Sequence, residues 1–284
     1  MATKKRDRWI ARASHVLLTS IVVSIVFMKK TQLQENLYNG NLYQVAAYLT
    51  LGIISTILYF ITSFLDPGYV YYNTIDPENG VIFNTKEDQA EILATNDQLD
   101  STESSCMLNT AHDARSIRLR RCGFCELMQP LRAKHCNECQ HCVRRYDHHC
   151  PWIGNCVGER NHKFFLSFLF SETLLVTWTV YVTVKAFHHD EEWKMWLEKN
   201  WVFLILTVFL SCSLLVVGLL WICHSYMMFT AQTTWEFMSR PRISYLKKFP
   251  DDYNPFHQGY LWNILSFLCY FRITNWDDVY HSAT

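Results

Sequence analysis

The fold of this chain is governed by the stretch CGFCELMQPLRAKHCNECQHCVRRYDHHCPWIGNC, residues 122–156. It contains seven cysteines, several of them two residues apart, together with several histidines. Cysteine pairs at this spacing on tight turns are a common sequence signature of structural zinc, which takes four thiolate or imidazole ligands in a tetrahedron. The stretch therefore predicts a zinc-binding domain.

Eight of these residues are enough for two closed zinc sites, and spacing alone allows either sequential or interlaced pairing. The eight are Cys122, Cys125, His135, Cys136, Cys139, Cys142, His149 and Cys156. Cys150 is then left over. Neighbouring residues rarely point to the same ion, so His149 on a metal would hold Cys150 beside the site. Cys150 is therefore either a nucleophile or a spare buried thiol.

The residues before Cys150 favour the nucleophile. A thiol attacks only as thiolate, and its free pKa of about 8.5 must be lowered by a neighbouring group. His148 is a candidate base, and Asp147 could hold its imidazole in one tautomer. We expect contact among three such close residues to need an irregular backbone, which adjacent metal sites could impose.

At these residues the chain resembles the DHHC-type zinc finger protein S-acyltransferases, which are membrane-bound palmitoyltransferases. The matching pattern extends well beyond the ligands and includes Pro130, Arg132, the run 147–152, Asn155, Asn161 and Phe165. Gln129 departs from the pattern, because the family usually carries a basic residue before the proline. This departure is expected to alter local contacts to the acyl donor.

The resemblance implies a role for each position. One structural zinc would be held by Cys122, Cys125, His135 and Cys142, and the other by Cys136, Cys139, His149 and Cys156. Cys150 would take the acyl group from a fatty acyl-CoA such as palmitoyl-CoA, with His148 as general base oriented by Asp147. The group would pass to an accessible cysteine of a cytosolic or membrane-associated protein. The cavity that holds the acyl chain would be lined by Trp152, Phe165, Phe168 and Leu175.

The rest of the chain predicts a membrane protein, although its formal net charge is zero and its mean hydropathy is −0.03. There are four apolar runs, at 13–28, 42–65, 164–185 and 201–224; the last three reach the roughly 20 residues that a spanning helix needs, and the first is a short span. A cleaved signal peptide is the alternative for the first run, but its end lacks a small-residue cleavage site. We expect an all-α polytopic membrane protein with four transmembrane helices and a small cytosolic cysteine-rich domain, 119–163, binding two zinc ions.

Orientation follows from basic residues, which concentrate on the cytosolic side of a membrane. Five of them precede the first span, whereas the connection at 188–200 carries two among four acidic residues. Residues 1–12 and 225–284 are therefore predicted to be cytosolic. The polar, acid-leaning segment 73–115 is expected to be a flexible linker, in which Cys106 is expected to be a bystander. Family members act mostly at the Golgi and endoplasmic reticulum, so the resemblance implies that location.

Three segments outside the cysteine-rich stretch match family motifs. Asp66-Pro67-Gly68 follows the second span and also forms a plain helix stop. Thr233-Thr234-Trp235-Glu236 follows the fourth span, and the resemblance implies a hydrogen bond of Thr234 near Asp147. Asn263 would have a packing and hydrogen-bonding role. Glu172, inside the third span, is either functional or part of an interhelical hydrogen bond.

Two other classes of function compete with an acyltransferase. A membrane-anchored interaction platform would need the zinc ligands but not Cys150, His148 or Asp147. A ubiquitin-ligase-like module would share interlaced ligands but normally has a different spacing and no spare nucleophile. The sequence favours the transferase, with the lipid bilayer, acyl-CoA and protein substrates as partners and no nucleic acid.

Overall fold

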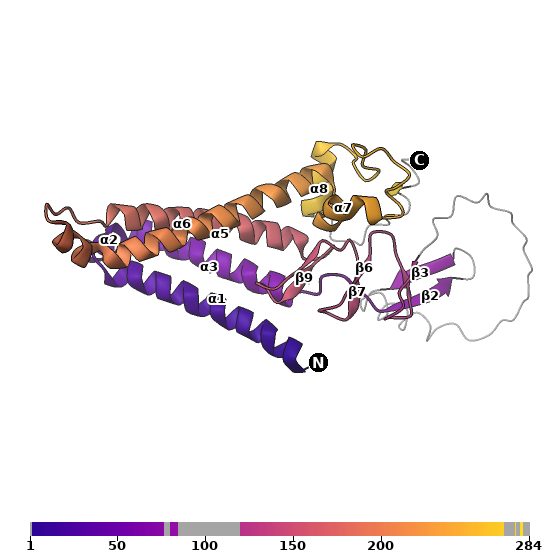
Figure 1. The fold of residues 1–284 in the computed structure, drawn as a ribbon, viewed down its shortest axis with the longest axis horizontal. Coiled ribbons are helices and arrows are strands. Elements are labelled where there is room, and N and C mark those ends of the chain that lie inside the picture. The colour runs from indigo at the N-terminus through magenta and orange to yellow at the C-terminus, as the bar shows by residue number, and fades with distance from the viewer. Residues whose placement is uncertain (1, 77–79, 85–119, 270–275, 277–278, 281–284) are drawn as a thin grey trace, which may run out of the picture.

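The computed structural model describes residues 2–76, 80–84, 120–269, 276 and 279–280. Its described part is mostly helical. The helices are α1 (Ala2–Met28), α2 (Gln32–Tyr38), α3 (Leu42–Phe64), α5 (His162–Lys185), α6 (Trp193–Thr230), α7 (Thr234–Ser239) and α8 (Tyr260–Cys269), with a 3-10 turn at Arg240–Arg242. Figure 1 shows the long helices side by side in an elongated bundle.

Four helices are long and apolar enough to cross a membrane among the residues described: Arg6–Met28 within α1, α3, α5 and α6. Apolar side chains such as Ile53, Ile205 and Leu215 are exposed on their outer faces, as lipid-facing surfaces require. The protein therefore has the helices of a four-span membrane protein. α1 and α6 extend beyond the apolar runs at 13–28 and 201–224, because a helix continues past its lipid-embedded part when polar residues are good helix formers.

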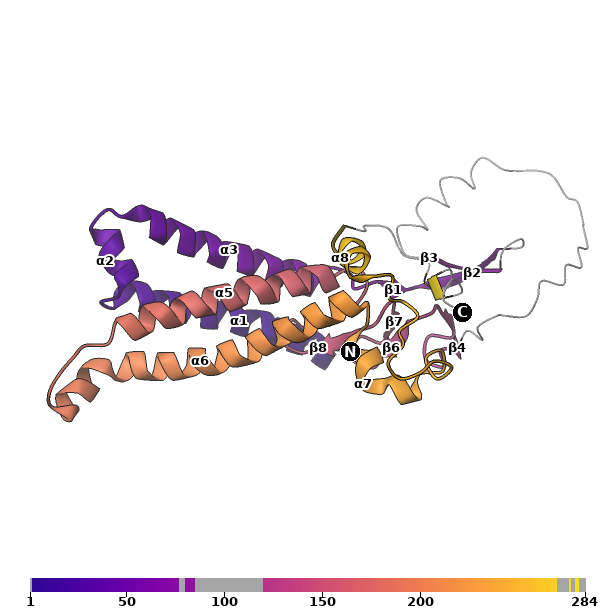
Figure 2. The ribbon, with the colours of Figure 1, turned by 90° about the horizontal axis from the view of Figure 1, so that it is seen from above.

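α5 lies in the middle of the bundle and packs against both α3 and α6, as Figure 2 shows. Polar groups inside the bundle are paired between helices. The Glu172 carboxylate on α5 accepts a hydrogen bond from Ser55 on α3, and the hydroxyl groups of Tyr48 and Thr179 lie 3.0 Å apart. The interhelical hydrogen bond that was one of two expectations for Glu172 is therefore present.

The cysteine-rich segment is built from short antiparallel hairpins rather than helices. A three-stranded sheet has the order β1 (Tyr69–Val70), β7 (His141–Val143), β6 (Lys134–Cys136). Three two-stranded sheets pair β4 (Arg120–Arg121) with β5 (Met128–Gln129), β8 (His148–Cys150) with β9 (Asn155–Val157), and β2 (Tyr72–Asp76) with β3 (Gly80–Asn84). The all-α description is thus not confirmed for this part of the chain.

Two tight turns shape the hairpins around the cysteine pairs. Glu126 and Gln140 each follow the second cysteine of a Cys-x2-Cys pair, and both adopt positive φ, 56° and 58°. Non-glycine residues adopt this left-handed conformation rarely, and it costs about 1 kcal/mol or more. The backbone N–H groups of Cys125 and Cys139 approach the sulfur atoms of Cys122 and Cys136 at 3.4 Å. The turns therefore hold both sulfurs of each pair on one side.

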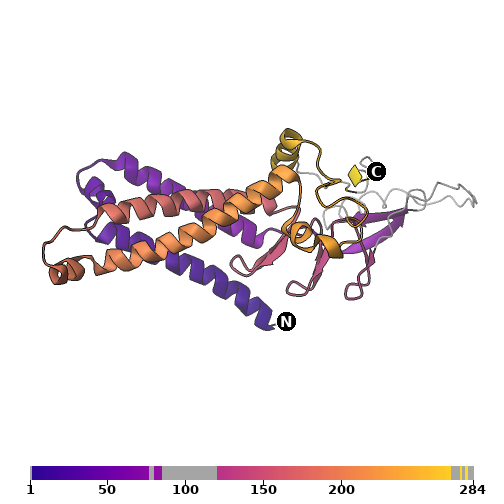
Figure 3. The same ribbon diagram turned by 45° about the horizontal axis from the view of Figure 1, so that its top comes forward.

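The loop at Asp66 joins the bundle to this domain. The Asp66 side chain accepts hydrogen bonds from the backbone N–H groups of Gly68 and Tyr69, both at 2.8 Å, which gives the predicted helix stop and turn. Gly68 adopts φ of 105°, where a side chain would be strained. Figure 3 shows the domain at one end of the bundle, close to the N-terminus and to α7, with α2 at the other end.

The segment at 73–115 is described only in part. Residues 72–76 and 80–84 form the antiparallel pair of β2 and β3. The remainder of the expected linker from residue 85 onward, including Cys106, lies outside the described residues.

Candidate functional site

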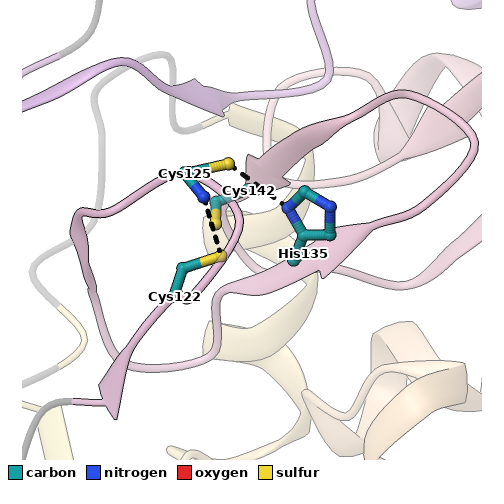
Figure 4. Close-up of side chains that lie close together, drawn as sticks. All are labelled: Cys122, Cys125, His135 and Cys142. Carbon is teal, nitrogen blue, oxygen red and sulfur yellow. Dashed lines mark hydrogen bonds between the residues drawn. The ribbon is translucent and has the colours of Figure 1, made fainter.

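The first group of metal-binding side chains lies between three hairpin strands (Figure 4). Cys122 follows β4, Cys125 closes the next turn, His135 lies on β6 and Cys142 on β7. One ligand atom from each lies within 4.8 Å of the others, and Cys125 Sγ is 3.3 Å from His135 Nδ1. Gln129 donates a hydrogen bond to Cys142 Sγ at 3.3 Å.

The second group contains Cys136, Cys139, His149 and Cys156, also within 4.8 Å of one another. Cys139 Sγ lies 3.4 Å from Cys156 Sγ and 3.5 Å from His149 Nδ1. Ligands on a tetrahedral zinc at about 2.0–2.3 Å are separated by roughly 3.3–3.8 Å. Both groups therefore fit a four-coordinate ion, and they are the interlaced sets that the resemblance implied rather than sequential ones.

Strand geometry explains how His149 and Cys150 serve different sites. Side chains alternate between the two faces of a strand, and β8 contains His148, His149 and Cys150. His149 therefore faces the second metal group, whereas His148 and Cys150 share the opposite face. A regular strand therefore places base and thiol side by side. Asp147 lies just before the strand, two residues after Arg145 with its positive φ of 40°, so the expected irregular backbone is found only on the Asp147 side.

Both carboxylate oxygens of Asp147 have hydrogen-bond donors. Oδ2 lies 2.6 Å from His148 Nδ1, and Oδ1 accepts the backbone N–H of Thr234 at 2.8 Å. The predicted contact of Thr234 is thus present, with the backbone as donor. Burial raises the pKa of Asp147, but the neighbouring His162 and His148 outweigh it and hold this pKa well below its usual range. Asp147 is therefore an ionised hydrogen-bond acceptor.

The same contacts shift the pKa values of the other two residues in opposite directions. Burial lowers the pKa of His148, but the hydrogen bond to Asp147 and the contact with Cys150 together raise it to about 9. Burial raises the pKa of the Cys150 thiol, and the hydrogen bond with His148 outweighs this and lowers it. Both shifts favour an imidazolium and thiolate pair over a neutral imidazole and thiol.

The thiol faces the membrane helices. Cys150 packs with Tyr59, Ile153, Phe165 and Leu169 in one apolar cluster. Tyr59 on α3 also donates a hydrogen bond to the Trp152 carbonyl at 3.0 Å, which ties the loop after Cys150 to the bundle.

The four residues expected to line the acyl-chain cavity lie at different depths in the bundle, measured from Cys150. Phe165 belongs to the Cys150 cluster and Phe168 packs against it. Leu175 lies further along α5 and lines a cavity of about 270 Å³ with residues of α1 and α3. Trp152, in contrast, is 79% exposed and faces outward from the described part of the protein.

The segment after α6 holds the cysteine-rich domain against the bundle. Thr233 and Glu236 form a reciprocal capping box at the start of α7, and Glu236 also makes a buried two-bond pair with Arg132 at 2.6 and 2.7 Å. Asn263 on α8 donates to the Phe229 carbonyl at 2.7 Å and accepts from the backbone of Gln258. The hydrogen-bonding role implied for Asn263 is confirmed.

Two histidines of this site were missed by sequence reasoning. His162 opens α5 and His224 lies near the end of α6 that meets the cysteine-rich domain, and both are buried next to Asp147. Single histidines at apolar helix positions carry no spacing signal, because their partners come from other elements of the fold.

The chain shows similarity to a defined family of enzymes. The sequence model described as DHHC palmitoyltransferase matches residues 115–241. Human palmitoyltransferase ZDHHC12 is 35% identical over 95% of this chain and 91% of its own length. Zebrafish palmitoyltransferase ZDHHC12-A is 37% identical over 95% and 93%, and protein S-acyltransferase 10 of Arabidopsis thaliana is 29% identical over 93% and 82%.

These similarities show that the chain belongs to the DHHC palmitoyltransferase family. It is an acyltransferase that palmitoylates proteins, and the alternative of a non-catalytic platform is not favoured. Within the family, two runs of this sequence, 144–146 before the signature and 234–237 after it, predict a relation to member twelve of the vertebrate set. The matches to ZDHHC12 proteins confirm that expectation.

Proposed function

We propose that Cys150 carries the fatty acyl group as a thioester during transfer from palmitoyl-CoA to a cysteine of a protein substrate. The observation that carries this proposal is that His148 and Cys150 lie on one face of β8, with Asp147 directly before the strand bound to His148 and the thiol facing the apolar cluster of the bundle. Donor and intermediate are both thioesters, so little net free energy is needed. Catalysis then depends on positioning and thiolate formation.

In the first half-reaction His148 takes the proton of the Cys150 thiol and the thiolate attacks the acyl carbonyl of the donor. The bond between the acyl carbon and the Cys150 sulfur forms, the bond to the CoA sulfur breaks, and the leaving thiolate takes the proton from His148. In the second half-reaction the substrate thiol loses its proton to His148 and attacks the Cys150 thioester. Cys150 leaves as the thiolate that pairs with His148.

The acyl chain is proposed to enter the bundle next to Phe165 and Phe168 and to extend toward Leu175. Support comes from the packing of the first two residues at the thiol and from the cavity beside the third. The exposed indole of Trp152 is proposed to close over a bound chain at the membrane surface.

Both metal groups are proposed to hold structural zinc. Their thiolate and imidazole donors are the ligands zinc prefers, and all four ligands of each group come from the protein, which leaves no open position for substrate. The ions would fix the hairpins and thereby the orientation of β8.

The cysteine-rich domain at 119–163 and both termini are proposed to lie in the cytosol, at the Golgi or endoplasmic reticulum membrane. The basic residues before the first span and the need of Cys150 for acyl-CoA and reduced protein thiols support this orientation. The proposed partners are cytosolic or membrane-associated proteins with accessible cysteines. The proposed spans remain 13–28, 42–65, 164–185 and 201–224, with 73–115 as linker and 225–284 as the C-terminal region.

The test compares the parent protein with Cys150→Ser in detergent, after confirming equal zinc content. Each is incubated with labelled palmitoyl-CoA, and the label released by hydroxylamine is measured. We expect label on the parent that is absent from the variant. Equal label on both would contradict the role of Cys150.

A further inference from the structure

His162 and His224 lie directly behind Asp147, and the proposed chemistry does not use either of them. His162 Nε2 is 3.1 Å from His224 Nδ1 and 3.9 Å from Asp147 Oδ1. Both side chains are almost fully buried, with 1% and 4% of their surface exposed. They come from two different membrane helices, α5 and α6. The contact therefore connects the bundle to the catalytic carboxylate.

Hydrogen-bond accounting assigns the proton of His162. Its Nδ1 is buried without a hydrogen-bond partner among the described residues. A hydrogen on Nδ1 would leave a buried N–H unsatisfied, which proteins tolerate less well than an unused acceptor. The hydrogen is therefore on Nε2, which donates to His224 Nδ1. This positively polarised N–H group also lies beside Asp147 Oδ1, with 3.9 Å between the nitrogen and the carboxylate oxygen.

His162 is thus a third polar neighbour of the Asp147 carboxylate, and it favours the orientation in which Oδ2 faces His148. Oδ2 accepts from His148, while Oδ1 accepts from Thr234 and faces His162 Nε2. The His224 ring also lies 5.5 Å from the His148 ring. The two histidines thus contact both members of the pair that activates Cys150.

The same atoms include donors suited to a metal ion, because Asp147, His148 and His224 place ligand atoms within 4.8 Å of one another. Two ligands of one zinc lie roughly 3 Å or more apart. The separation of Asp147 Oδ2 and His148 Nδ1 is 2.6 Å, which is a hydrogen bond. Hydrogen bonding therefore accounts better for this group, and metal binding is an outcome that the experiment can detect.

We propose that His162 and His224 are positioning residues for acyl transfer: His224 holds the His162 ring by the hydrogen bond, the polar Nε2–H group beside Asp147 Oδ1 favours one orientation of the carboxylate, and His148 is thereby aligned with Cys150. The inference rests on the roles of Asp147, His148 and Cys150 given under the proposed function. It makes the packing of α5 against α6 a determinant of the catalytic geometry.

The primary experiment measures the single-turnover rate of Cys150 acylation and the palmitoyl-CoA concentration at half-saturation. His162→Phe and His224→Phe keep ring volume but remove the hydrogen bond, so we expect the maximum rate to fall roughly tenfold. The half-saturating concentration should stay unchanged. His162→Gln and His224→Asn retain a donor and an acceptor near the same positions, and they should recover the rate to within about threefold of the parent.

A double-variant cycle separates positioning from general damage. If His162 acts through Asp147, adding His162→Phe to Asp147→Asn should cause no further loss of rate. Multiplicative losses would overturn the proposal. Phe267→Leu is the packing control, because the rings of Phe267 and His162 pack with their centroids 5.0 Å apart and Phe267 makes no hydrogen bond to His162. We expect it to lower the melting temperature while leaving the maximum rate within about twofold.

The remaining outcomes are also decisive. Full rate in both Phe variants, with label still dependent on Cys150, would overturn this inference and leave the proposed function intact. Label that persists in Cys150→Ser would instead overturn the proposed function. Inhibition of the parent by added Zn²⁺ that disappears in a fully active His224→Phe would identify a metal site and overturn the positioning role. If the Phe variants do not fold, His162→Gln is compared with His162→Asn, whose shorter amide cannot reach the position of Nε2. An acylation rate in His162→Asn that is as high as in His162→Gln would overturn the positioning role.

Discussion

Cys150 and His149 are adjacent in sequence but belong to different sites because β8 is an extended strand. Alternation of side chains sends His149 to the second metal group and leaves His148 and Cys150 on the face toward the bundle. The chemistry of the thiol then depends on one short contact, between His148 Nδ1 and Asp147 Oδ2 at 2.6 Å. This residue-scale geometry makes two predictions.

Asp147→Asn should slow acylation of Cys150 by roughly 10²–10⁴-fold, because the amide N–H would face His148 Nδ1 and favour the wrong tautomer. The measurement is the single-turnover rate with labelled palmitoyl-CoA. Zinc content and melting temperature serve as controls, since Asn can still accept the hydrogen bond from Thr234. A parental rate in a folded, zinc-loaded variant would contradict the role of Asp147.

Alkylation of Cys150 by a neutral thiol reagent should depend on pH as its lowered pKa requires. Cys150 is a thiolate at pH values above its pKa in the folded protein. Its reactivity should therefore persist at pH values below the pKa of an ordinary thiol, and be lost only as the pH falls through the lowered pKa of Cys150. His148→Gln removes the stabilising imidazolium and leaves burial, which raises the pKa of Cys150, opposed only by the weaker backbone hydrogen bonds of Ile153 and Trp152. Its reactivity profile should therefore shift to higher pH, and an unchanged profile would show that His148 does not activate the thiol.

At the scale of elements, the hairpins and α7 are held by contacts that no single motif contains. Arg132 lies after β5, and its guanidinium makes a buried pair with Glu236 on α7 while also donating to the Ala231 carbonyl. Thr234, on the same short helix, reaches Asp147. Docking of α7 is therefore coupled to the orientation of the catalytic carboxylate.

Arg132→Met should destabilise the protein by roughly 3–5 kcal/mol, because it leaves the Glu236 carboxylate buried without its charged partner. The double variant Arg132→Met/Glu236→Leu removes both charges and should recover much of this loss. Thermal unfolding in detergent measures both. Equal destabilisation in the single and double variants would show that Arg132 stabilises the fold through packing, and that the unpaired Glu236 charge adds nothing to the loss.

The two metal groups share a strand, so their occupancy should be coupled. β6 carries His135 of the first group and Cys136 of the second, one residue apart. A chelator should therefore remove both zinc ions in one cooperative transition, with loss of acylation in step, because binding and folding of such hairpins are linked. Full acylation after removal of both ions would contradict their structural role.

The sequence predicted the elements that depend on local pattern and missed those that depend on tertiary contact. Apolar runs predicted the four long helices, and ligand spacing predicted the eight residues that the fold gathers into two groups able to hold a metal ion. The hairpins were not foreseen, because the two- and three-residue strands around His135 and Cys142 carry too little pattern. His162 and His224 were missed for a different reason: their role arises only when α5 packs against α6 behind Asp147.

At the scale of the whole molecule, the thiol lies where the cysteine-rich domain meets the bundle. α5 runs from this junction along the bundle, and it carries Phe165 near Cys150 and Leu175 beside the deeper cavity. The length of acyl chain that fits into the bundle should therefore be set by residues of α5 that lie far from Cys150, such as Leu175. The distance between thiol and cavity is a property of the assembled fold and could not be predicted from one sequence.

Leu175→Phe should shift the preference of the enzyme toward shorter acyl chains, because the larger ring fills space in the cavity of about 270 Å³. Competition between myristoyl-CoA and palmitoyl-CoA measures the ratio of the two acyl groups on Cys150. Val184→Phe is a matched control, since Val184 lies on the same helix with an exposed side chain. An equal shift in the control, or none in Leu175→Phe, would contradict this placement of the chain.

If acyl transfer passes through Cys150, the acyl group on this residue must be chased onto a substrate thiol. The parent protein is loaded with labelled palmitoyl-CoA, freed of donor, and mixed with a cysteine peptide, while the label on protein and peptide is followed in time. We expect label to leave Cys150 at the rate at which it appears on the peptide, and this rate to be at least the steady-state turnover rate. Label that stays on the protein while the peptide is acylated only after fresh donor is added would contradict transfer through Cys150.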